Sequence, residues 1–145
     1  MHRVLVAAVA FCCLTASSVL AQHHGAGTLR PYAAVPFMSD RDVPCLASAL
    51  QTGNPQAGPS TWILKAPSGC VVPWHSHTAQ EQLIVVAGDV TAEMTGHGAA
   101  RLGPGGFAMM EGGMAHQFTC RSVEACVLFA IFDRAYDIKW GKARP

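Results

Sequence analysis

Charged side chains are scarce in this chain, since Asp, Glu, Lys and Arg together make up 13% of its 145 residues. No run of basic residues is present that could follow a phosphate backbone, so a nucleic acid is not an expected partner. Half of the residues are hydrophobic, which predicts a compact core and argues against an intrinsically disordered chain. The length suits one domain.

Long hydrophobic runs are missing too, apart from one near the N-terminus. Residues 4–14 form an apolar stretch, preceded by the positive charge of Arg3 and followed by small residues up to Ala21. This stretch is shorter than the roughly 20 apolar residues that a membrane-spanning helix needs. The pattern predicts a signal peptide over residues 1–21, cleaved near Ala21, and a periplasmic or secreted protein with no membrane span after cleavage. The alternative is a retained N-terminal anchor.

The sequence also has no stretch with helical periodicity. From Ser60 onward, short β-rich runs alternate with turns rich in glycine, proline and aspartate. The expected strands are residues 61–66, 70–74, 82–87, 90–95, 107–110, 116–120, 126–132 and 136–140. This pattern predicts an all-β sandwich, jelly roll or barrel over residues 60–140. Residues 22–59 are expected to form an N-terminal extended arm, with a short helix or strand near residues 45–50.

The chain has an even number of cysteines. Two of the six cysteines lie in the predicted signal peptide, and the other four are Cys45, Cys70, Cys120 and Cys126. An even number of cysteines in an exported protein permits disulfides, although spacing alone does not determine the pairing. Cys120 and Cys126 flank a short polar segment between two strand-like runs, which favours a disulfide between them. Buried free thiols are the alternative.

Four residues form a pattern of metal ligands. His75 and His77 are two residues apart on an expected strand, so both imidazoles point to the same face. Glu81 follows four residues later, where a turn can return its carboxylate to that face. His116 begins another expected strand. Imidazole and carboxylate ligands together suit one divalent transition metal, namely Fe, Mn, Ni, Cu or Zn, and do not discriminate among these metals.

These residues also carry a family resemblance. The segment from Gly69 to Gly88 resembles the first cupin motif, G-x5-H-x-H-x3-E-x6-G, at every fixed position. The segment from Gly105 to Cys120 resembles the second motif, G-x5-P-x-G-x2-H-x3-N, with Glu111 in place of the proline and Cys120 in place of the asparagine. The resemblance implies a cupin double-stranded β-helix, a jelly-roll barrel, with a metal bound inside by His75, His77, Glu81 and His116. It also implies that Cys120 has a disulfide or packing role.

Apolar residues near these motifs are candidates for a pocket above the metal. Leu83 and Val85 share strand parity with Glu81, and Phe118 shares parity with His116, so these three are expected to face inward. The wider candidate set is Trp74, Leu83, Val85, Met94, Met109, Phe118 and Phe132. Ordinary barrel packing is the alternative for each of them.

Two functions are compatible with the pattern. The first is a metal-dependent oxygenase of a small uncharged or aromatic molecule, because three imidazoles and one carboxylate leave coordination positions open. The second is a non-enzymatic protein that binds a metal or a small ligand, because no Lys or Arg and no separate acid–base residue lies inside the ligand motifs. The cupin resemblance further implies a homodimer that pairs through an N-terminal strand.

Overall fold

Short strands are the main regular elements in the part of this protein that the structure describes. The computed structural model describes residues 27–141, of which residues 31–141 form one compact unit. The predicted signal peptide, residues 1–21, lies outside the described residues. Apart from a single 3-10 turn at Tyr32–Ala34, every regular element is a strand, and no helix in residues 27–141 is long and apolar enough to cross a bilayer.

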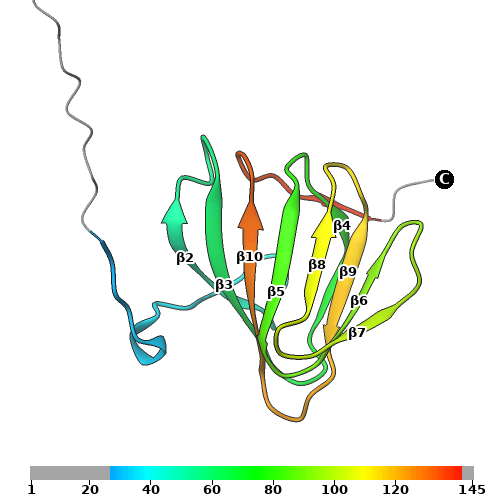
Figure 1. Cartoon of the computed structure of the whole chain (residues 1–145), viewed down its shortest axis with the longest axis horizontal. Coiled ribbons are helices and arrows are strands. Elements are labelled where there is room, and N and C mark those ends of the chain that lie inside the picture. The colour runs from blue at the N-terminus through cyan, green and yellow to red at the C-terminus, as the bar shows by residue number, and fades with distance from the viewer. Residues whose placement is uncertain (1–26, 142–145) are drawn as a thin grey trace, which may run out of the picture. The chain divides into compact units, whose positions relative to one another are not determined.

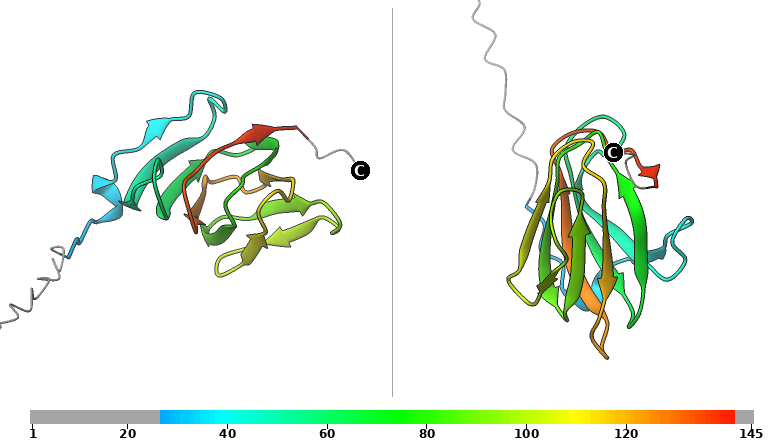
Figure 2. Two further views of the ribbon diagram at one scale, coloured as in Figure 1. Left: turned by 90° about the horizontal axis from the view of Figure 1, so that it is seen from above. Right: turned by 90° about the vertical axis from the view of Figure 1, so that its right-hand side faces the viewer.

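The strands form two antiparallel sheets (Figure 1). The larger has the order β1-β2-β3-β10-β5-β8, and the smaller has the order β11-β4-β9-β6-β7. The left view in Figure 2, which is seen from above, shows the two sheets facing each other, as in a jelly roll. The strands are β1 Met38–Ser39, β2 Ala47–Gly53, β3 Ser60–Ala66, β4 Val71–Ser76, β5 Glu81–Ala87, β6 Val90–Met94, β7 Ala100–Leu102, β8 Phe107–Met110, β9 His116–Cys120, β10 Cys126–Phe132 and β11 Lys139–Trp140.

The core lies between the two sheets and follows strand alternation. In β5 the buried positions are Glu81, Leu83 and Val85, whereas Val86 on the opposite face is exposed. In β10 the inward residues Leu128, Ala130 and Phe132 meet them across the ladder. Alternation with period two therefore turns one stripe of each strand toward a shared interior.

The all-β jelly roll expected from the sequence is confirmed. Each of the eight expected strands is present, although the last is confined to Lys139–Trp140. The glycine-rich stretch between the strands expected at residues 90–95 and 107–110 contains a further short strand, β7, which pairs with β6. The turn at Gly88–Asp89 joins β5 to β6, and Gly88 has a φ of +78° that favours glycine.

The segment expected to form an extended arm, residues 22–59, also contributes two strands to the larger sheet. Strand β2 pairs along its length with β3, and β1 pairs with β2, so both extend the larger sheet. The compact unit thus begins near Pro31 rather than at Ser60. A short helix or strand was expected near residues 45–50, but its place in the larger sheet was not, because β2 has only one fully buried side chain, Ala49, and so shows little strand alternation.

Two disulfides lie at one end of the barrel. Cys120, the last residue of β9, bonds Cys126, the first residue of β10, with an S–S distance of 2.05 Å. Cys45, before β2, bonds Cys70, before β4, with an S–S distance of 2.07 Å. The second bond links a segment of the larger sheet to one of the smaller sheet. We call this end of the barrel, with its four cysteines, the disulfide end.

Candidate metal centre

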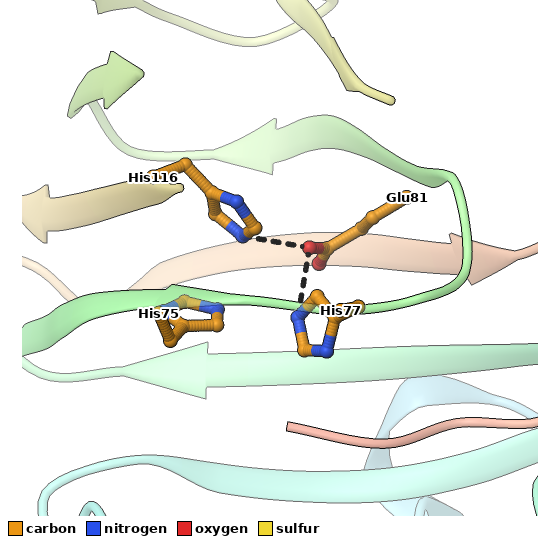
Figure 3. A group of neighbouring side chains, drawn as sticks. All are labelled: His75, His77, Glu81 and His116. Atoms are coloured by element: carbon orange, nitrogen blue, oxygen red, sulfur yellow. Dashed lines mark ion pairs between the residues drawn. The ribbon is translucent and has the colours of Figure 1, made fainter. Parts of the chain in front are cut away.

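The four predicted ligands meet at the other end of the barrel, which we call the ligand end. His75 lies near the end of β4, His77 follows it, and Glu81 is the first residue of β5. His116 begins β9 and is the cross-strand partner of His75. Figure 3 shows the four side chains pointing toward one another. The turn between β4 and β5 returns Glu81 to the histidine face.

The cluster is tight and buried. One ligand atom from each residue lies within 4.8 Å of the others, and each residue is at most 4% exposed. The Oε2 atom of Glu81 lies 2.9 Å from His116 Nε2 and 3.2 Å from His77 Nε2. Such burial of four ionisable groups is costly unless a partner compensates it.

Backbone carbonyls set the tautomer of each imidazole. His75 Nδ1 lies 2.6 Å from the carbonyl oxygen of Pro73, and His116 Nδ1 lies 3.0 Å from that of Met114. His77 Nδ1 contacts the carbonyl oxygen of Asp137. A carbonyl only accepts, so each Nδ1 carries the proton and donates it. In a neutral ring, each Nε2 then presents a lone pair, the arrangement of metal-bound histidine.

The centre of the cluster requires positive charge. Glu81 Oε2 and His116 Nε2 are fully buried and have no hydrogen-bond partner, and both are acceptors when the imidazole is neutral. Two acceptors 2.9 Å apart repel unless a cation lies between them. A divalent metal meets this requirement, and without one, protons must take its place. Three imidazoles and a carboxylate therefore fit the metal that the fold implies.

Burial and mutual contacts shift the pKa values of three of the four residues. Burial raises the pKa of the Glu81 carboxyl, but the contacts with His116 and His77 outweigh it and lower the pKa to about 2. Burial and the nearby His116 lower the pKa of His75 to about 4, so this imidazole is neutral at pH 7. Burial lowers the pKa of His77, but its contacts with Glu81 produce a net increase.

Two glycines let the second motif approach the first. A Cβ on Gly112 would lie 2.5 Å from the carbonyl oxygen of Thr78, so only glycine fits without a shift. The amide of Gly113 donates to the carbonyl oxygen of His77 at 2.7 Å. Glu111, in place of the usual proline, is exposed and accepts from Gln80 Nε2 at 3.3 Å. The loop of the second motif is thereby fastened to the loop that carries His77 and Glu81.

A cavity of about 300 Å³ opens beside the ligands. His75, His77 and Glu81 lie on its wall, which is otherwise largely apolar and aromatic. Lysine and arginine are absent from the described residues that line it. The remaining lining residues are Asp40, Val43, Leu46, Ser48, Pro55, Gln56, Trp62, Leu64, Val72, Phe118, Ala130, Phe132, Tyr136, Ile138 and Trp140.

Only part of the predicted pocket lines this cavity. Phe118 and Phe132 do, but Leu83 and Val85 are core residues, at most 3% exposed, that do not reach the cavity wall. Their side chains do face inward, as strand parity predicted, but each step along β5 from Glu81 leads deeper toward the disulfide end.

The prediction that Met109 lines the pocket is wrong for another reason. Met109 alternates with buried Met110 and faces outward, 41% exposed. Trp74 and Met94 are also absent from the lining.

Sequence reasoning missed most of the aromatic wall. Trp62 lies on β3, while Tyr136, Ile138 and Trp140 lie in the segment after β10. The Tyr136 ring lies 5.2 Å from the His77 ring, and the Trp140 ring lies 5.4 Å from the His75 ring. Burial, followed by the negative charge of Glu81, raises the pKa of Tyr136, so its hydroxyl keeps its proton and can donate. The one available signal in the sequence was that residues 136, 138 and 140 are aromatic or aliphatic and alternate with the charged residues 137 and 139, which places the three on a common face.

The fold and the site together define a class: a small jelly-roll barrel with three histidines and one glutamate facing its interior. The family comparison agrees, because residues 62–132 match the model of the cupin domain. The chain belongs to the cupin superfamily.

A curated relative gives a more specific likeness. The chain is 35% identical over 66 residues to dimethylsulfoniopropionate lyase DddQ from Ruegeria pomeroyi. The match covers 44% of this chain and 33% of the lyase, so the chain spans about a third of that relative's length. The crystal structure of the same lyase matches with a TM-score of 0.57 and 22% identity, over 72% of this chain and 54% of the lyase chain.

Two other solved structures share the fold at lower identity. KdgF from Halomonas sp. matches with a TM-score of 0.62 and 18% identity, over 74% of this chain and 95% of KdgF. The polyketide cyclase RemF from Streptomyces resistomycificus matches with a TM-score of 0.68 and 13% identity, over 79% and 84% of the two chains. At these identities the likeness establishes the fold alone.

Proposed function

We propose that this protein is a metal-dependent enzyme that acts on a small organic molecule held in the cavity. The observation that carries the proposal is the position of the ligands. His75, His77 and Glu81 lie on the wall of a cavity of about 300 Å³ instead of being enclosed by protein on all sides. Structural metal sites are closed by their ligands, whereas catalytic sites keep a position open to substrate.

The cavity wall indicates the substrate class. It is rich in aromatic and aliphatic side chains, and its described residues include no lysine or arginine to pair with a phosphate. Trp62, Phe132 and Tyr136 offer apolar contacts and aromatic edge-to-face contacts to an uncharged or aromatic molecule. The Tyr136 hydroxyl can donate a hydrogen bond to an oxygen of that molecule.

Oxygenation is the reaction class that we favour. A bound divalent metal would supply Lewis-acid or redox chemistry at the cavity wall. The chain itself provides the rest: three imidazoles with fixed tautomers, a carboxylate that holds negative charge, and an apolar wall that excludes water around the substrate.

Elimination is a second candidate reaction, supported by the 35% identity to a dimethylsulfoniopropionate lyase. Non-enzymatic binding of a metal or small ligand is a third function. Its support is that, among the described residues, Asp40 and Tyr136 are the only ionisable side chains on the cavity wall besides the metal ligands.

Export is part of the proposal. Its support is the sequence pattern of residues 1–21 together with the two disulfides, which persist in oxidising compartments.

Elemental analysis of the purified protein tests the site. We expect about one equivalent of a first-row metal in the wild-type protein and none when His75, His77 and His116 are all changed to alanine. His97→Ala is the matched control, because His97 is an exposed histidine outside the cluster. Absence of metal from the wild-type protein, after incubation with Fe(II), Mn(II), Ni(II), Cu(II) and Zn(II) in turn, overturns the proposed metal site.

Assays of the metal-loaded protein separate the reactions. Oxygen uptake across a panel of small aromatic compounds supports an oxygenase, and cleavage of dimethylsulfoniopropionate supports a lyase. Tight metal retention with neither activity supports the binding protein.

A further inference from the structure

The segment after β10, residues 133–141, crosses the ligand end of the barrel, and we call it the C-terminal strap. It leaves the larger sheet at Phe132 and joins the smaller sheet as β11, where Lys139 pairs with Ser76 and Trp140 pairs with His75. In Figure 1 the strap is the red segment that runs from the top of β10 toward β4. It therefore connects the two sheets over the metal ligands.

The strap has two faces of different chemistry. Tyr136, Ile138 and Trp140 line the cavity, whereas Asp137 and Lys139, at the alternate positions, form an exposed ion pair of 3.5 Å with each other. The same extended segment therefore supplies part of the substrate wall on one face and carries polar anchors on the other.

The polar face fastens the strap to the loop between His77 and Glu81. Asp137 Oδ1 accepts from the Thr78 amide at 2.6 Å and from Thr78 Oγ1 at 3.0 Å. Nearer β10, Asp133 Oδ1 accepts from the Gln80 amide at 2.9 Å. Thr78 and Gln80 both lie between the two ligands in sequence. Movement of the strap would thus move the ligand loop with it.

One ligand depends directly on the strap. His75 and His116 donate from Nδ1 to carbonyls only two residues before them, so their orientation is set locally. His77 instead donates to the carbonyl of Asp137, sixty positions later in the chain. The orientation of this imidazole therefore exists only when the strap is docked, and the Asp137 side chain holds its own carbonyl in place through Thr78.

We propose that Asp137 is a positioning residue for His77 and that docking of the C-terminal strap is coupled to metal binding. The inference rests on the metal site proposed above. Because binding energies are reciprocal, a docked strap strengthens metal binding, and a bound metal strengthens strap docking. The cavity wall formed by Tyr136, Ile138 and Trp140 is then complete in the metal-loaded protein, so metal loading prepares the site for substrate.

Zinc affinity, measured by competition with a chromophoric chelator, tests the role of Asp137. Asp137→Ala removes the anchor and should weaken zinc binding about 10-fold or more, the range typical of residues that orient a metal-bound histidine. Asp137→Asn keeps an acceptor oxygen and should restore most of the affinity. Asp133→Ala is the matched control, because it removes a similar bond to the same loop without touching His77, and it should change affinity less than about threefold.

Hydrogen exchange of the full chain, with and without zinc, tests the coupling. In the wild-type protein zinc should slow exchange in the strap, at the amides of Tyr136 and Gly141 that donate to Pro55 and Trp74. The β6–β7 hairpin serves as the internal reference. In Asp137→Ala this protection by zinc should be lost, whereas a merely structural residue would leave the zinc response unchanged.

The outcomes separate the two proposals. Wild-type protein that binds no zinc or other divalent metal overturns the metal site. Wild-type protein that binds zinc without slowing exchange in the strap overturns the coupling, and an Asp137→Ala variant with unchanged zinc affinity overturns the positioning role. Both outcomes leave the metal site standing.

Discussion

The two ends of this barrel are completed by different chemistry. At the disulfide end, Cys120 and Cys126 are fully buried and covalently joined, and Cys45 and Cys70 tie the larger sheet to the smaller one. At the ligand end, three imidazoles and a carboxylate are buried just as deeply, but two of their atoms lack a hydrogen-bond partner. One end is complete as a polypeptide, whereas the other requires a cation.

The difference shows how a small barrel can place a reactive site in its interior. Buried ionisable groups destabilise a fold unless they are compensated. Covalent links at the opposite end restrict the unfolded chain, which offsets part of that cost without occupying the cavity. The stability of the ligand end should therefore depend on metal and on pH, and that of the disulfide end on redox state.

Metal removal should give the largest effect. If free metal is about a thousandfold above its Kd, chelation should lower the free energy of unfolding by about 4 kcal/mol. Thermal unfolding with and without a chelator measures this loss. The variant with His75, His77 and His116 changed to alanine should show no response. An equal response in that variant would mean that the chelator acts elsewhere.

The two disulfides should contribute unequally, because they close loops of different length. The sequence separation is 25 residues for Cys45–Cys70 and 6 residues for Cys120–Cys126. Loop-closure entropy predicts contributions of roughly 3.5 and 2 kcal/mol respectively. Denaturant unfolding with and without reductant measures each bond by itself, in a variant whose other cysteine pair is changed to alanine. A larger effect for Cys120–Cys126 would contradict the prediction.

Acid should destabilise the metal-free protein at the ligand end. The pKa of His75 falls from 6.5 to about 4 on folding, so the unfolded chain binds this proton more strongly than the folded chain. Stability is therefore lost as the pH falls from about 6.5 toward 4, by roughly 3 kcal/mol from this group. His75→Gln, which cannot titrate, should unfold with a shallower dependence on pH over that range. Equal slopes in the two proteins would refute the role of His75.

Gly112→Ala should produce the smallest change, confined to the ligand end. The added methyl group would meet the Thr78 carbonyl at 2.5 Å and push the two motif loops apart. Zinc affinity should fall about 10-fold, as expected when a ligand's support is displaced. Gly98→Ala is the control, because nothing lies within 4 Å of its added Cβ and its φ is not in the left-handed region. Unchanged zinc affinity in Gly112→Ala would show that the loops adapt.

Strand parity was the most informative feature of the sequence for predicting the site. The spacing of His75, His77 and Glu81 predicted their common face, and the structure brings them together with His116. Parity also turned Leu83, Val85 and Phe118 inward, as found. It could not give depth along the barrel, and depth decides that Phe118 reaches the cavity while Leu83 and Val85 do not.

Contacts between distant segments lay beyond pattern reading. Strand β2 was expected in an arm, but it joins the larger sheet through pairing with β3. The carbonyl that orients His77 comes from Asp137, and nothing in either residue's sequence neighbourhood indicates the other. Such pairs depend on the path of the chain rather than on local periodicity.

The sequence by itself determined the all-β class, the cupin motifs and the face on which the candidate ligands lie, because those properties depend on residue type and on a period of two. Only the tertiary structure decided which residues form the cavity wall, which sheet the N-terminal strands join and which segment covers the ligands. These features arise where strands from distant parts of the chain meet, and their positions are set by sheet register and twist rather than by the order of residues.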